Sequence, residues 1–190
     1  EDMKQIYHYF TSEINYPGAM QPEQRGTDPA DVDLVDRIAR EWAQAYPDLD
    51  TSPIAILGRV TYVASIAAHR LDVNLERHAV SRSEFDVLGA LARADRPLRA
   101  SEVVSTTMLS GASITKLTEN LSKRGLLRRN RSSRDGRVVL LDLTDDGRRL
   151  VDEELPRRLA DDEQVLAVLD ADERATLTAL LRKVSANLSG

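Results

Sequence analysis

The sequence predicts a mainly α-helical fold with a small β-hairpin wing. Apolar residues recur at helical spacing along most of the chain. Two short helices separated by a few residues are predicted over 100–124, and two strand-like runs joined by a loop containing Asp135-Gly136 follow them directly. A helix-turn-helix followed by a hairpin forms a winged helix-turn-helix lobe, and we expect the remaining helices to form a dimerisation region.

The composition excludes several classes of protein. A chain of 190 residues with 42% hydrophobic content suits one domain, or two closely packed lobes, with a real core. The absence of cysteine excludes disulfides, thiol catalysis and cysteine-based metal sites. No apolar run approaches the roughly 18 residues of a membrane span. We therefore expect a cytoplasmic protein with no membrane partner.

The first part of the chain differs from the rest. Residues 1–19 are rich in aromatic side chains without a clear period, and Gly18-Ala19-Met20 resembles a junction left by cloning. We interpret residues 1–19 as a tag or disordered leader. A native aromatic arm that packs on a partner is the alternative.

Two helices are predicted before residue 80. A proline among acidic residues at 28–31 is typical of a helix start, and helical spacing continues to Tyr46. Ser52-Pro53 starts a second helix, with serine as N-cap and proline in the first turn, which runs to about His78. Its many apolar positions predict burial against several partners.

Three helices precede the hairpin. The capping box Ser81-Arg82-Ser83-Glu84 opens a helix to about Ala94. A short helix covers Ala100 to about Thr107, and Ser110 caps a third helix that runs from Gly111 to Arg124. The last two helices form the predicted helix-turn-helix.

The hairpin and two further helices complete the predicted elements. Residues 126–130 and 138–143 are the strand-like runs. Thr144 caps a long helix that we expect to bend or break at Pro156, because proline removes a backbone donor. A last helix is predicted from the acidic start at 170–173 through Leu188.

The helix over 111–124 and the hairpin after it form a basic region in an acidic protein. The formal net charge is −5, yet between residues 110 and 137 eight lysines and arginines stand against Glu119 and Asp135. Such a local excess is typical of a nucleic-acid-binding element. On a helical wheel Ile114, Leu117 and Leu121 form the face that packs on the lobe. The opposite face, small and cationic, is expected to enter the major groove of double-stranded DNA; a solvated helix face is the alternative. The candidate DNA-binding residues are Ser113, Thr115, Lys116, Lys123, Arg131 and Arg134.

These residues have different expected roles. Lys116 is suited to a guanine or a phosphate, and Thr115 to a thymine methyl group. Arg134, at the wing tip, is expected to enter a narrow minor groove. Arg137, at the base of the wing, is expected to pair with Asp135 and hold the hairpin's shape.

The terminal helices carry more apolar surface than the small lobe can cover. A homodimer joined by its first and last helices is the simplest way to bury it, and packing within one chain is the alternative. The apolar residues concerned are Val165, Leu166, Leu169, Leu177, Leu180, Leu181, Val184 and Leu188.

From Ser81 to Thr144 the sequence resembles the MarR family of winged-helix regulators. The resemblance rests on Ser110-Gly-Ala-Ser-Ile-Thr-Lys, on Leu121 followed by Gly125-Leu-Leu, and on Arg134-Asp-Gly-Arg137. Ser132 stands where the family's wing often has aspartate. With the terminal helices, the resemblance extends from about Asp31 to Leu188. It implies a homodimeric transcription regulator that binds a pseudo-palindrome and represses genes until a small ligand arrives.

A narrower resemblance, to the urate-responsive and PecS-like branch, rests on the extra N-terminal helix with Trp42, and on Asp86 and Arg93. In that branch the tryptophan and arginine line an anion pocket, and the aspartate is linked to an arginine of the recognition helix. Here Lys116 takes the place of that arginine. The resemblance implies a small anionic ligand, either a urate-like purine or a di- or tricarboxylate, bound by Trp42, Asp86, Arg93 and Lys116.

The residues themselves partly agree with this pocket. Asp86, Gly89, Ala90 and Arg93 share one helical face, which describes a small polar recess, and the planar fork of Arg93 suits a carboxylate. The alternative is that Trp42 is a plain core or interface aromatic and that the two charged residues form a surface pair.

Other functions are less consistent with the sequence. It holds no Walker loop, dinucleotide fingerprint, zinc-protease motif or nucleophile elbow, so we expect no enzyme and no cofactor. A regulator that responds to pH or metal through His69 and His78 is one alternative. A protein-interaction adaptor without DNA binding is another.

The predicted division of the chain has four parts. Residues 1–19 are the tag or leader, and residues 20–79 the N-terminal helices for dimerisation and one wall of the ligand pocket. Residues 80–144 are the winged helix-turn-helix, and residues 145–190 the C-terminal dimerisation helices.

Overall fold

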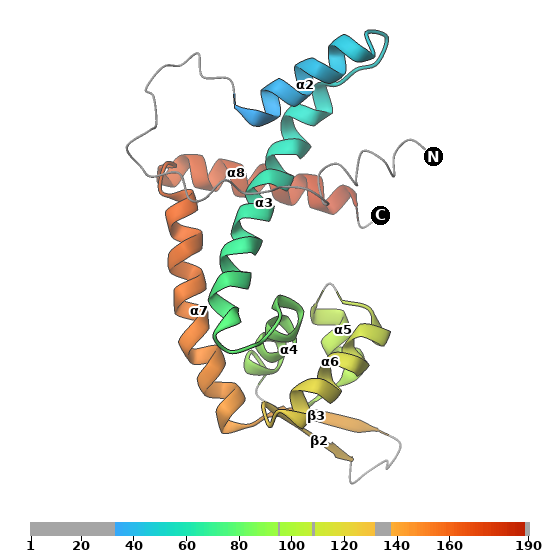
Figure 1. The fold of residues 1–190 in the computed structure, drawn as a ribbon, viewed down its shortest axis with the longest axis vertical. Helices are drawn as coiled ribbons and strands as arrows, with labels where there is room; N and C mark the ends of the chain where they lie inside the picture. The colour runs from blue at the N-terminus through green and yellow to red at the C-terminus, as the bar shows by residue number, and fades with distance from the viewer. Residues whose placement is uncertain (1–32, 95, 108, 132–137, 189–190) are drawn as a thin grey trace. The chain divides into compact units, whose positions relative to one another are not determined.

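The computed structural model describes residues 33–94, 96–107, 109–131 and 138–188 (Figure 1). The chain divides into two compact units, after Ile66. The predicted class, mainly helical with a small antiparallel sheet, is confirmed. The predictions on residues 1–19 and on Arg134, Asp135 and Arg137 lie outside the described residues.

The first unit holds helix α2 (Leu34–Ala45) and the beginning of helix α3 (Ser52–Glu76). Helix α2 has Asp33 as its N-cap, and the Asp33 carboxylate accepts a hydrogen bond from the backbone N–H of Asp36 at 2.9 Å. That hydrogen bond, helped by Arg59, lowers the pKa of Asp33 against the opposing effect of burial. The cap lies after the acidic start predicted at 28–31, which is outside the described residues.

Helices α2 and α3 approach each other closely at Gly58. A Cβ atom on Gly58 would lie only 2.8 Å from Cγ1 of Val35, the buried residue of α2, so a side chain there would separate the helices. Nearby, Arg59 pairs with both Asp33 and Asp36 at 2.8 Å. The periodicity along α2 did not identify Val35 as its buried position.

The second unit is the predicted winged helix-turn-helix with the two C-terminal helices. Its elements follow the end of α3 in this order: α4 (Arg82–Ala92), β1 (Leu98–Arg99), α5 (Ala100–Thr106), α6 (Gly111–Lys123), β2 (Leu127–Arg131), β3 (Val139–Leu143), α7 (Asp145–Leu166) and α8 (Ala171–Asn187). The predicted boundaries agree to within two residues at the ends of α3 to α6 and of the hairpin strands.

The sheet has a third strand that the sequence analysis did not predict. The strand order is β1-β3-β2, and both pairings are antiparallel. In β1, Leu98 pairs with Leu141 and is buried, whereas Arg99 is exposed. A strand of two residues carries no detectable period, so only the pairing with β3 reveals it.

One hydrophobic core holds the second unit together. Fully buried side chains come from the end of α3, from α4 and α5, from α6 and from the sheet; they include Leu75, Leu88, Val103, Ile114, Leu121, Leu127 and Leu141. Each buried leucine or isoleucine stabilises the fold by about 1.5 to 3 kcal/mol. This core fixes the platform from which α6 and the hairpin project.

Helix α7 runs through Pro156 without a break, so of the predicted bend or break, the break is wrong. Tertiary contacts on both sides of the proline tie α7 to the end of α3. Before it, Glu154 binds Arg77, and after it, Asp161 accepts a hydrogen bond from Asn74 at 2.7 Å. These contacts offset the backbone hydrogen bond that proline removes.

Helix α8 buries none of its residues within the described chain. Its apolar side chains form one row at helical spacing: Leu177, Leu180, Leu181, Val184 and Leu188, which are 39% to 81% exposed. A row of this size is unusual on the free surface of a monomer. None of the described helices has the length and apolar character needed to span a membrane.

Candidate nucleic-acid interface and effector residues

Helix α6 has the two faces predicted for a DNA-reading helix. Ile114 and Leu121 are fully buried and Leu117 is half-buried, which seats the helix on the core. The opposite face is exposed throughout and consists of Ala112, Thr115, Lys116, Glu119 and Lys123. The arrangement predicted from the helical wheel is confirmed.

Local sequence explains where α6 begins and ends. The Ser110 hydroxyl accepts a hydrogen bond from the backbone N–H of Ser113 at 3.3 Å, which is an N-cap. At the other end Gly125 has a φ of 73°, a left-handed conformation that glycine adopts without strain. A Cβ atom on Gly111 would meet nothing within 4 Å, so the first turn is open to a partner.

Helix α5, the first helix of the helix-turn-helix, is capped by a charged side chain. Hydrogen bonds from the Arg96 guanidinium and from the backbone N–H of Arg99 lower the pKa of Glu102 to about 2. Glu102 therefore stays ionised at neutral pH and interacts favourably with the positive end of the α5 dipole.

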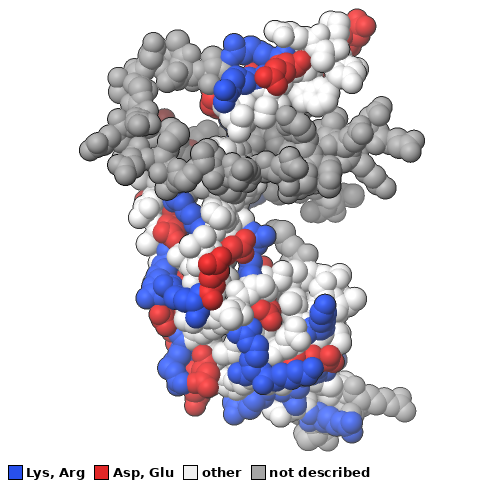
Figure 2. Space-filling view, in the orientation of Figure 1, with Lys and Arg blue, Asp and Glu red and all other residues white. Residues whose placement is uncertain are grey.

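The basic residues of the region separate into two groups. Arg124, Arg128 and Arg129 have acidic partners within the unit, namely Glu84, Asp142 and Glu119. By contrast Lys116, Lys123 and Arg131 are exposed, and none of them has an ion-pair partner in the described part of the chain. Figure 2 shows lysine and arginine side chains gathered where α6 and the hairpin lie. The three unpaired cations were all predicted as DNA-binding residues.

The hydroxyl groups of Ser113, Thr115 and Thr118 in α6 form hydrogen bonds within the helix or with its N-cap. Thr115 Oγ1 donates to the carbonyl of Gly111 at 3.2 Å, and Ser113 Oγ lies 2.9 Å from Ser110 Oγ. The Thr115 methyl group and the lone pairs of both hydroxyls remain available. Thr118 is buried, and its hydroxyl donates to the Thr115 carbonyl at 3.0 Å.

The wing presents its basic side chains outward. In β2, Leu127 is buried and the next four residues are exposed. Arg131 ends the strand, opposite Val139 of β3. Arg134, the residue predicted for the minor groove, lies outside the described residues.

The predicted effector residues of α4 do not all share one open face. Asp86 and Gly89 are half-buried, but Ala90 is 3% exposed and belongs to the core, so the predicted recess is wrong at that position. The reason is that α4 packs on α6, α7 and the sheet together, which buries more than one stripe of the helix. Arg93 is the C-cap of α4, and its guanidinium lies over Gly89, 3.4 Å from where a Cβ atom would be.

No ion pair among the described residues links Asp86 to Arg93 or to Lys116. Lys116 is exposed on α6, as the helical wheel predicted. Trp42 belongs to the first unit, where it is half-buried on α2 and stacks on Tyr46 with ring centroids 5.4 Å apart. Its indole ring is therefore part of an aromatic pair within the first unit.

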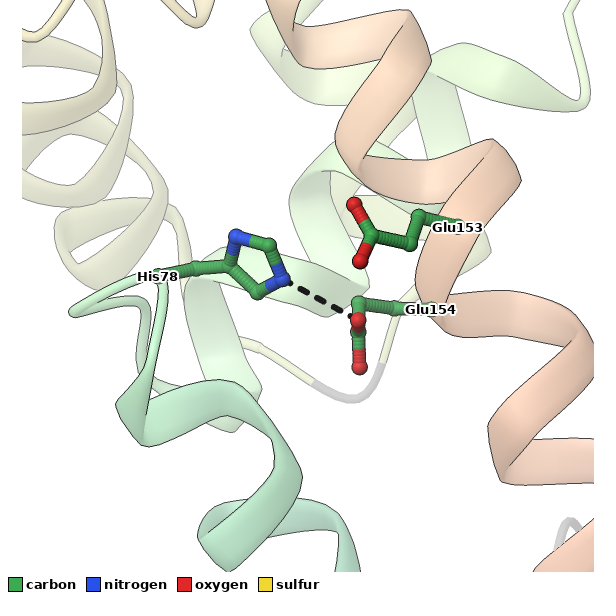
Figure 3. Close-up of side chains that lie close together, drawn as sticks. All are labelled: His78, Glu153 and Glu154. Carbon is green, nitrogen blue, oxygen red and sulfur yellow. Dashed lines mark hydrogen bonds and ion pairs between the residues drawn. The ribbon is translucent and has the colours of Figure 1, made fainter.

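Charged side chains surround the buried carboxylate of Glu154 in α7, and Figure 3 shows His78 and Glu153 beside it. Its carboxylate is 1% exposed and accepts hydrogen bonds from Arg77 at 2.6 and 2.7 Å and from Arg157 at 2.8 Å, and the His78 Nε2 atom lies 3.0 Å from it. Burial alone would raise the pKa of Glu154, but the hydrogen bonds from Arg77 and His78 outweigh it and lower the pKa.

Sequence patterns identified His78 as a candidate sensor, but they did not identify its neighbours Glu154, Arg77 and Arg157. A signal existed, because Glu154 lies four residues after Leu150 and three after Val151, both of them buried. A glutamate on the buried stripe of a helix requires a cationic partner. His69, the other histidine considered as a sensor, is exposed on α3.

The possible metal-ligand atoms of His78, Glu153 and Glu154 lie within 4.8 Å of one another, which is close enough for one metal ion to bind all three. Both oxygens of Glu154, however, already accept hydrogen bonds from arginine. Two guanidinium groups beside the site oppose a divalent cation electrostatically. The cluster is therefore poorly suited to binding a metal ion.

Comparisons with known proteins agree with this geometry. Residues 79–138 match the sequence model described as the MarR family. The transcriptional regulator PecS of Dickeya dadantii is 29% identical over 156 residues, which cover 81% of this chain and 94% of PecS.

Solved structures extend the comparison to the fold. A structure of BpsR of Bordetella bronchiseptica, described as showing how 6-hydroxynicotinic acid regulates its DNA binding, is 27% identical with a TM-score of 0.61. It covers 68% of this chain and 92% of BpsR. AbsC of Streptomyces coelicolor, a MarR family regulator 20% identical, shares the fold with a TM-score of 0.66 over 75% of this chain and 97% of its own. Residues 79–138 of this chain thus match the MarR family, and the chain as a whole is similar in sequence and fold to winged helix-turn-helix transcriptional regulators of that family.

Proposed function

We propose that this protein is a repressor that binds a pseudo-palindromic operator as a homodimer and is released by a small organic anion. The observation that supports DNA binding is the set of unpaired cations Lys116, Lys123 and Arg131 on one helix and the adjoining strand. Neighbouring arginines have acidic partners, so these three have charge available for phosphates.

The homodimer is supported by the apolar row on α8. Leu177, Leu180 and Leu181, with Val184 and Leu188, lie at helical spacing and are exposed. Burying each of these leucines in a partner helix stabilises a dimer by about 1.5 to 3 kcal/mol before the cost of association. A two-fold dimer places two copies of α6 to read two half-sites, which accounts for the pseudo-palindrome.

The effector class is supported by Arg93 and Trp42 and by the relatives. The match to PecS covers 81% of this chain, which agrees with a place for this protein in the PecS-like branch. BpsR responds to 6-hydroxynicotinic acid, a planar organic acid. Arg93 suits a carboxylate or urate-like anion and Trp42 suits a planar ring, with Asp86 and Lys116 as the link to α6. A urate-like purine, a pyridine carboxylate or a di- or tricarboxylate fits this description.

Salt-dependent DNA binding tests the core of the proposal. The wild-type protein is expected to bind duplex DNA with an affinity that falls steeply as salt rises. Lys123→Ala is expected to weaken binding to all duplexes and to lower the slope of log affinity against log salt by about one. Glu119→Gln, on the same exposed face, serves as the control and leaves the slope unchanged or steeper. DNA binding that is absent, or insensitive to salt, favours the adaptor instead.

Thermal shifts identify the effector site. Purified protein is melted with urate, 6-hydroxynicotinic acid, citrate and succinate, beside the variants Arg93→Ala and Arg131→Ala. A ligand at about 100 times its dissociation constant stabilises the folded state by about 2.7 kcal/mol, or about 5 to 10 °C here. Arg93→Ala is expected to abolish that rise and Arg131→Ala to keep it. A rise that survives in Arg93→Ala places the effector elsewhere.

A second input, pH, is favoured by the position of the His78 ring against the buried Glu154 carboxylate. The Glu154 carboxylate also accepts hydrogen bonds from Arg77 and Arg157. The charged groups around the ring are Arg77, Arg124, Asp146, Arg149, Glu153, Glu154 and Arg157. DNA affinity that changes between pH 5.5 and 8 in the wild type but not in His78→Gln supports this input, and equal profiles exclude it.

A further inference from the structure

Arg124 is the C-cap residue of α6, yet its side chain points back to the lobe. Its Nη2 atom donates to the backbone carbonyl of His78 at 2.8 Å, across 46 residues of sequence. Its Nη1 atom lies 3.6 Å from the Glu84 carboxylate. One guanidinium therefore joins the end of α6 to the corner between α3 and α4 and to the first turn of α4.

Glu84 is itself held firmly. It is 7% exposed, and its Oε2 atom accepts hydrogen bonds from the backbone N–H of Ser81 at 2.9 Å and from the Ser81 hydroxyl at 3.1 Å. The first of these bonds, together with the bond that the backbone N–H of Glu84 donates to the Ser81 hydroxyl at 3.3 Å, forms the capping box of α4. A carboxylate this deeply buried favours a cationic partner, and Arg124 supplies it.

The corner that carries the His78 carbonyl is also fixed. Ala79 has a φ of 50°, which is strained for a residue other than glycine and persists only where the surroundings hold it. The backbone N–H of His78 donates to the Leu75 carbonyl at 3.0 Å, and the His78 ring contacts Glu154 of α7 (Figure 3). Arg124 therefore binds the His78 carbonyl, whose position is already fixed by contacts of His78 with α3 and α7.

The contact has a geometry that hydrophobic packing alone does not supply. Ile114 and Leu121 seat α6 on the core, but apolar contacts are non-directional and leave the angle of the helix weakly specified. The Arg124 guanidinium borders a hollow of about 330 Å³, so polar contacts rather than packing set its position. Charge-assisted hydrogen bonds are short and directional, which suits them to fixing an angle.

A small change of this angle has a large effect at the other end of α6. The helix has 13 residues and is therefore about 20 Å long. A tilt of about 3° at Arg124 moves the first turn, with Gly111 and Ser113, by about 1 Å. A displacement of that size breaks the hydrogen-bond geometry on which base reading depends.

We propose that Arg124 is a positioning residue that sets the angle of the recognition helix on the lobe and does not itself contact DNA. The proposal rests on the proposed DNA-binding function. It distinguishes Arg124 from its neighbour Lys123, which is exposed and has no ion-pair partner among the described residues. It predicts that Arg124 governs the specificity of DNA binding, whereas Lys123 contributes general affinity.

The test compares two duplexes, one selected by the wild-type protein from a randomised pool and one scrambled from it. Arg124→Ala is expected to lower affinity for the selected duplex about tenfold, to leave the scrambled duplex within about twofold, and to keep the salt slope unchanged. Lys123→Ala is the matched control, and it is expected to weaken both duplexes and lower the slope by about one. Arg124→Lys, which keeps the charge but not the fork, is expected to give an intermediate loss of specificity.

Glu84→Gln provides an independent variant that leaves Arg124 in place. Arg124→Ala and Glu84→Gln both remove the Arg124–Glu84 ion pair. The loss of specificity in the double variant is therefore expected to be less than the product of the two single losses. Arg124→Lys keeps the test decisive if Arg124→Ala fails to fold, since thermal melts of each variant report folding separately.

Other outcomes overturn the inference. If Arg124→Ala weakens both duplexes equally and lowers the salt slope by about one, Arg124 is a phosphate contact. Unchanged specificity in folded Arg124→Ala, or in Arg124→Lys where the former does not fold, removes the positioning role and leaves DNA binding intact. A wild-type protein that selects no duplex and shows no salt-dependent binding contradicts the proposed function itself.

Discussion

One nitrogen of the Arg77 guanidinium lies 2.6 Å from one carboxylate oxygen of Glu154 and 2.7 Å from the other. The two residues are 77 positions apart and join the end of α3 to the middle of α7. Glu154 is 1% exposed, whereas Arg77 is 43% exposed. The Glu154 carboxylate is therefore desolvated, whereas the Arg77 guanidinium remains partly hydrated. Breaking the pair costs free energy mainly because the buried carboxylate loses its partner.

Glu154→Gln is expected to destabilise the second unit by about 2 kcal/mol, because charge-assisted hydrogen bonds to a buried group are lost while the arginines stay solvated. Glu153→Gln is the matched control. Glu153 pairs with the same Arg157 at 2.8 Å but is 50% exposed, so its loss is expected to cost less than about 0.5 kcal/mol. Urea unfolding of the two variants measures both values, and equal losses would contradict this account.

The stabilisation from Glu154 is expected to depend on pH. Its pKa in the folded protein is lowered from the ordinary value of 4.5. A carboxyl group whose folded pKa is depressed stabilises the fold fully above its unfolded pKa and loses that contribution as pH falls through the folded pKa. The difference in unfolding free energy between wild type and Glu154→Gln is therefore expected to be constant above about pH 5.5 and to shrink below about pH 4.5. A difference that grows on acidification would refute the lowered pKa.

Gly147→Ala is expected to destabilise the protein by about 3 kcal/mol or more, through overpacking at the start of α7. A Cβ atom at Gly147 would lie 2.0 Å from the backbone carbonyl oxygen of Leu126, which cannot move without disturbing β2. Gly111→Ala is the control, because a Cβ atom there meets nothing within 4 Å. That change is expected to stabilise the helix by up to about 1 kcal/mol. Thermal unfolding of both variants gives the comparison, which fails if Gly147→Ala is neutral.

Leu180→Glu is expected to convert the proposed homodimer to a monomer, because it places a charge in the middle of the apolar row on α8. Ala179→Glu is the control on the opposite side of the same helix, where the side chain is also exposed. Light scattering after size exclusion gives the mass of each variant. A wild-type monomer, or a Leu180→Glu dimer, would show that another surface joins the subunits or that none does.

Lys116→Ala is expected to weaken DNA binding and also to reduce the response of the residual binding to the effector. The reason is the proposed exchange of Lys116 between DNA and Asp86; no ion pair joins Lys116 to Asp86 among the described residues. The measurement is the ratio of DNA affinities with and without the anion found by thermal shift. An unchanged ratio in Lys116→Ala would exclude Lys116 as the switch.

Local patterns were sufficient to predict most elements of this fold. Ser81 with Glu84, and Ser110 before Gly111, are capping signals whose hydrogen bonds form between residues three apart, so the chain needs no distant partner to express them. The two faces of α6 follow from the period of Ile114, Leu117 and Leu121 for the same reason. The excess of positive charge in the hairpin region is also a property of composition.

Contacts between distant segments decided the rest. The strand β1 exists because Leu98 pairs with Leu141, and Ala90 is buried because α4 packs on several neighbours. Helix α7 continues through Pro156, and on either side of the proline Glu154 and Asp161 are bound by Arg77 and Asn74, at and just after the end of α3.

The functional roles of the basic residues divide in the same way. Sequence alone determined that eight cations lie between residues 110 and 137, but not which of them are neutralised. Tertiary structure turned Arg124, Arg128 and Arg129 toward acidic partners and left Lys116, Lys123 and Arg131 exposed. The physical reason is that charge is a local property of the chain, whereas the pairing of charges depends on which distant side chains the fold brings within about 4 Å.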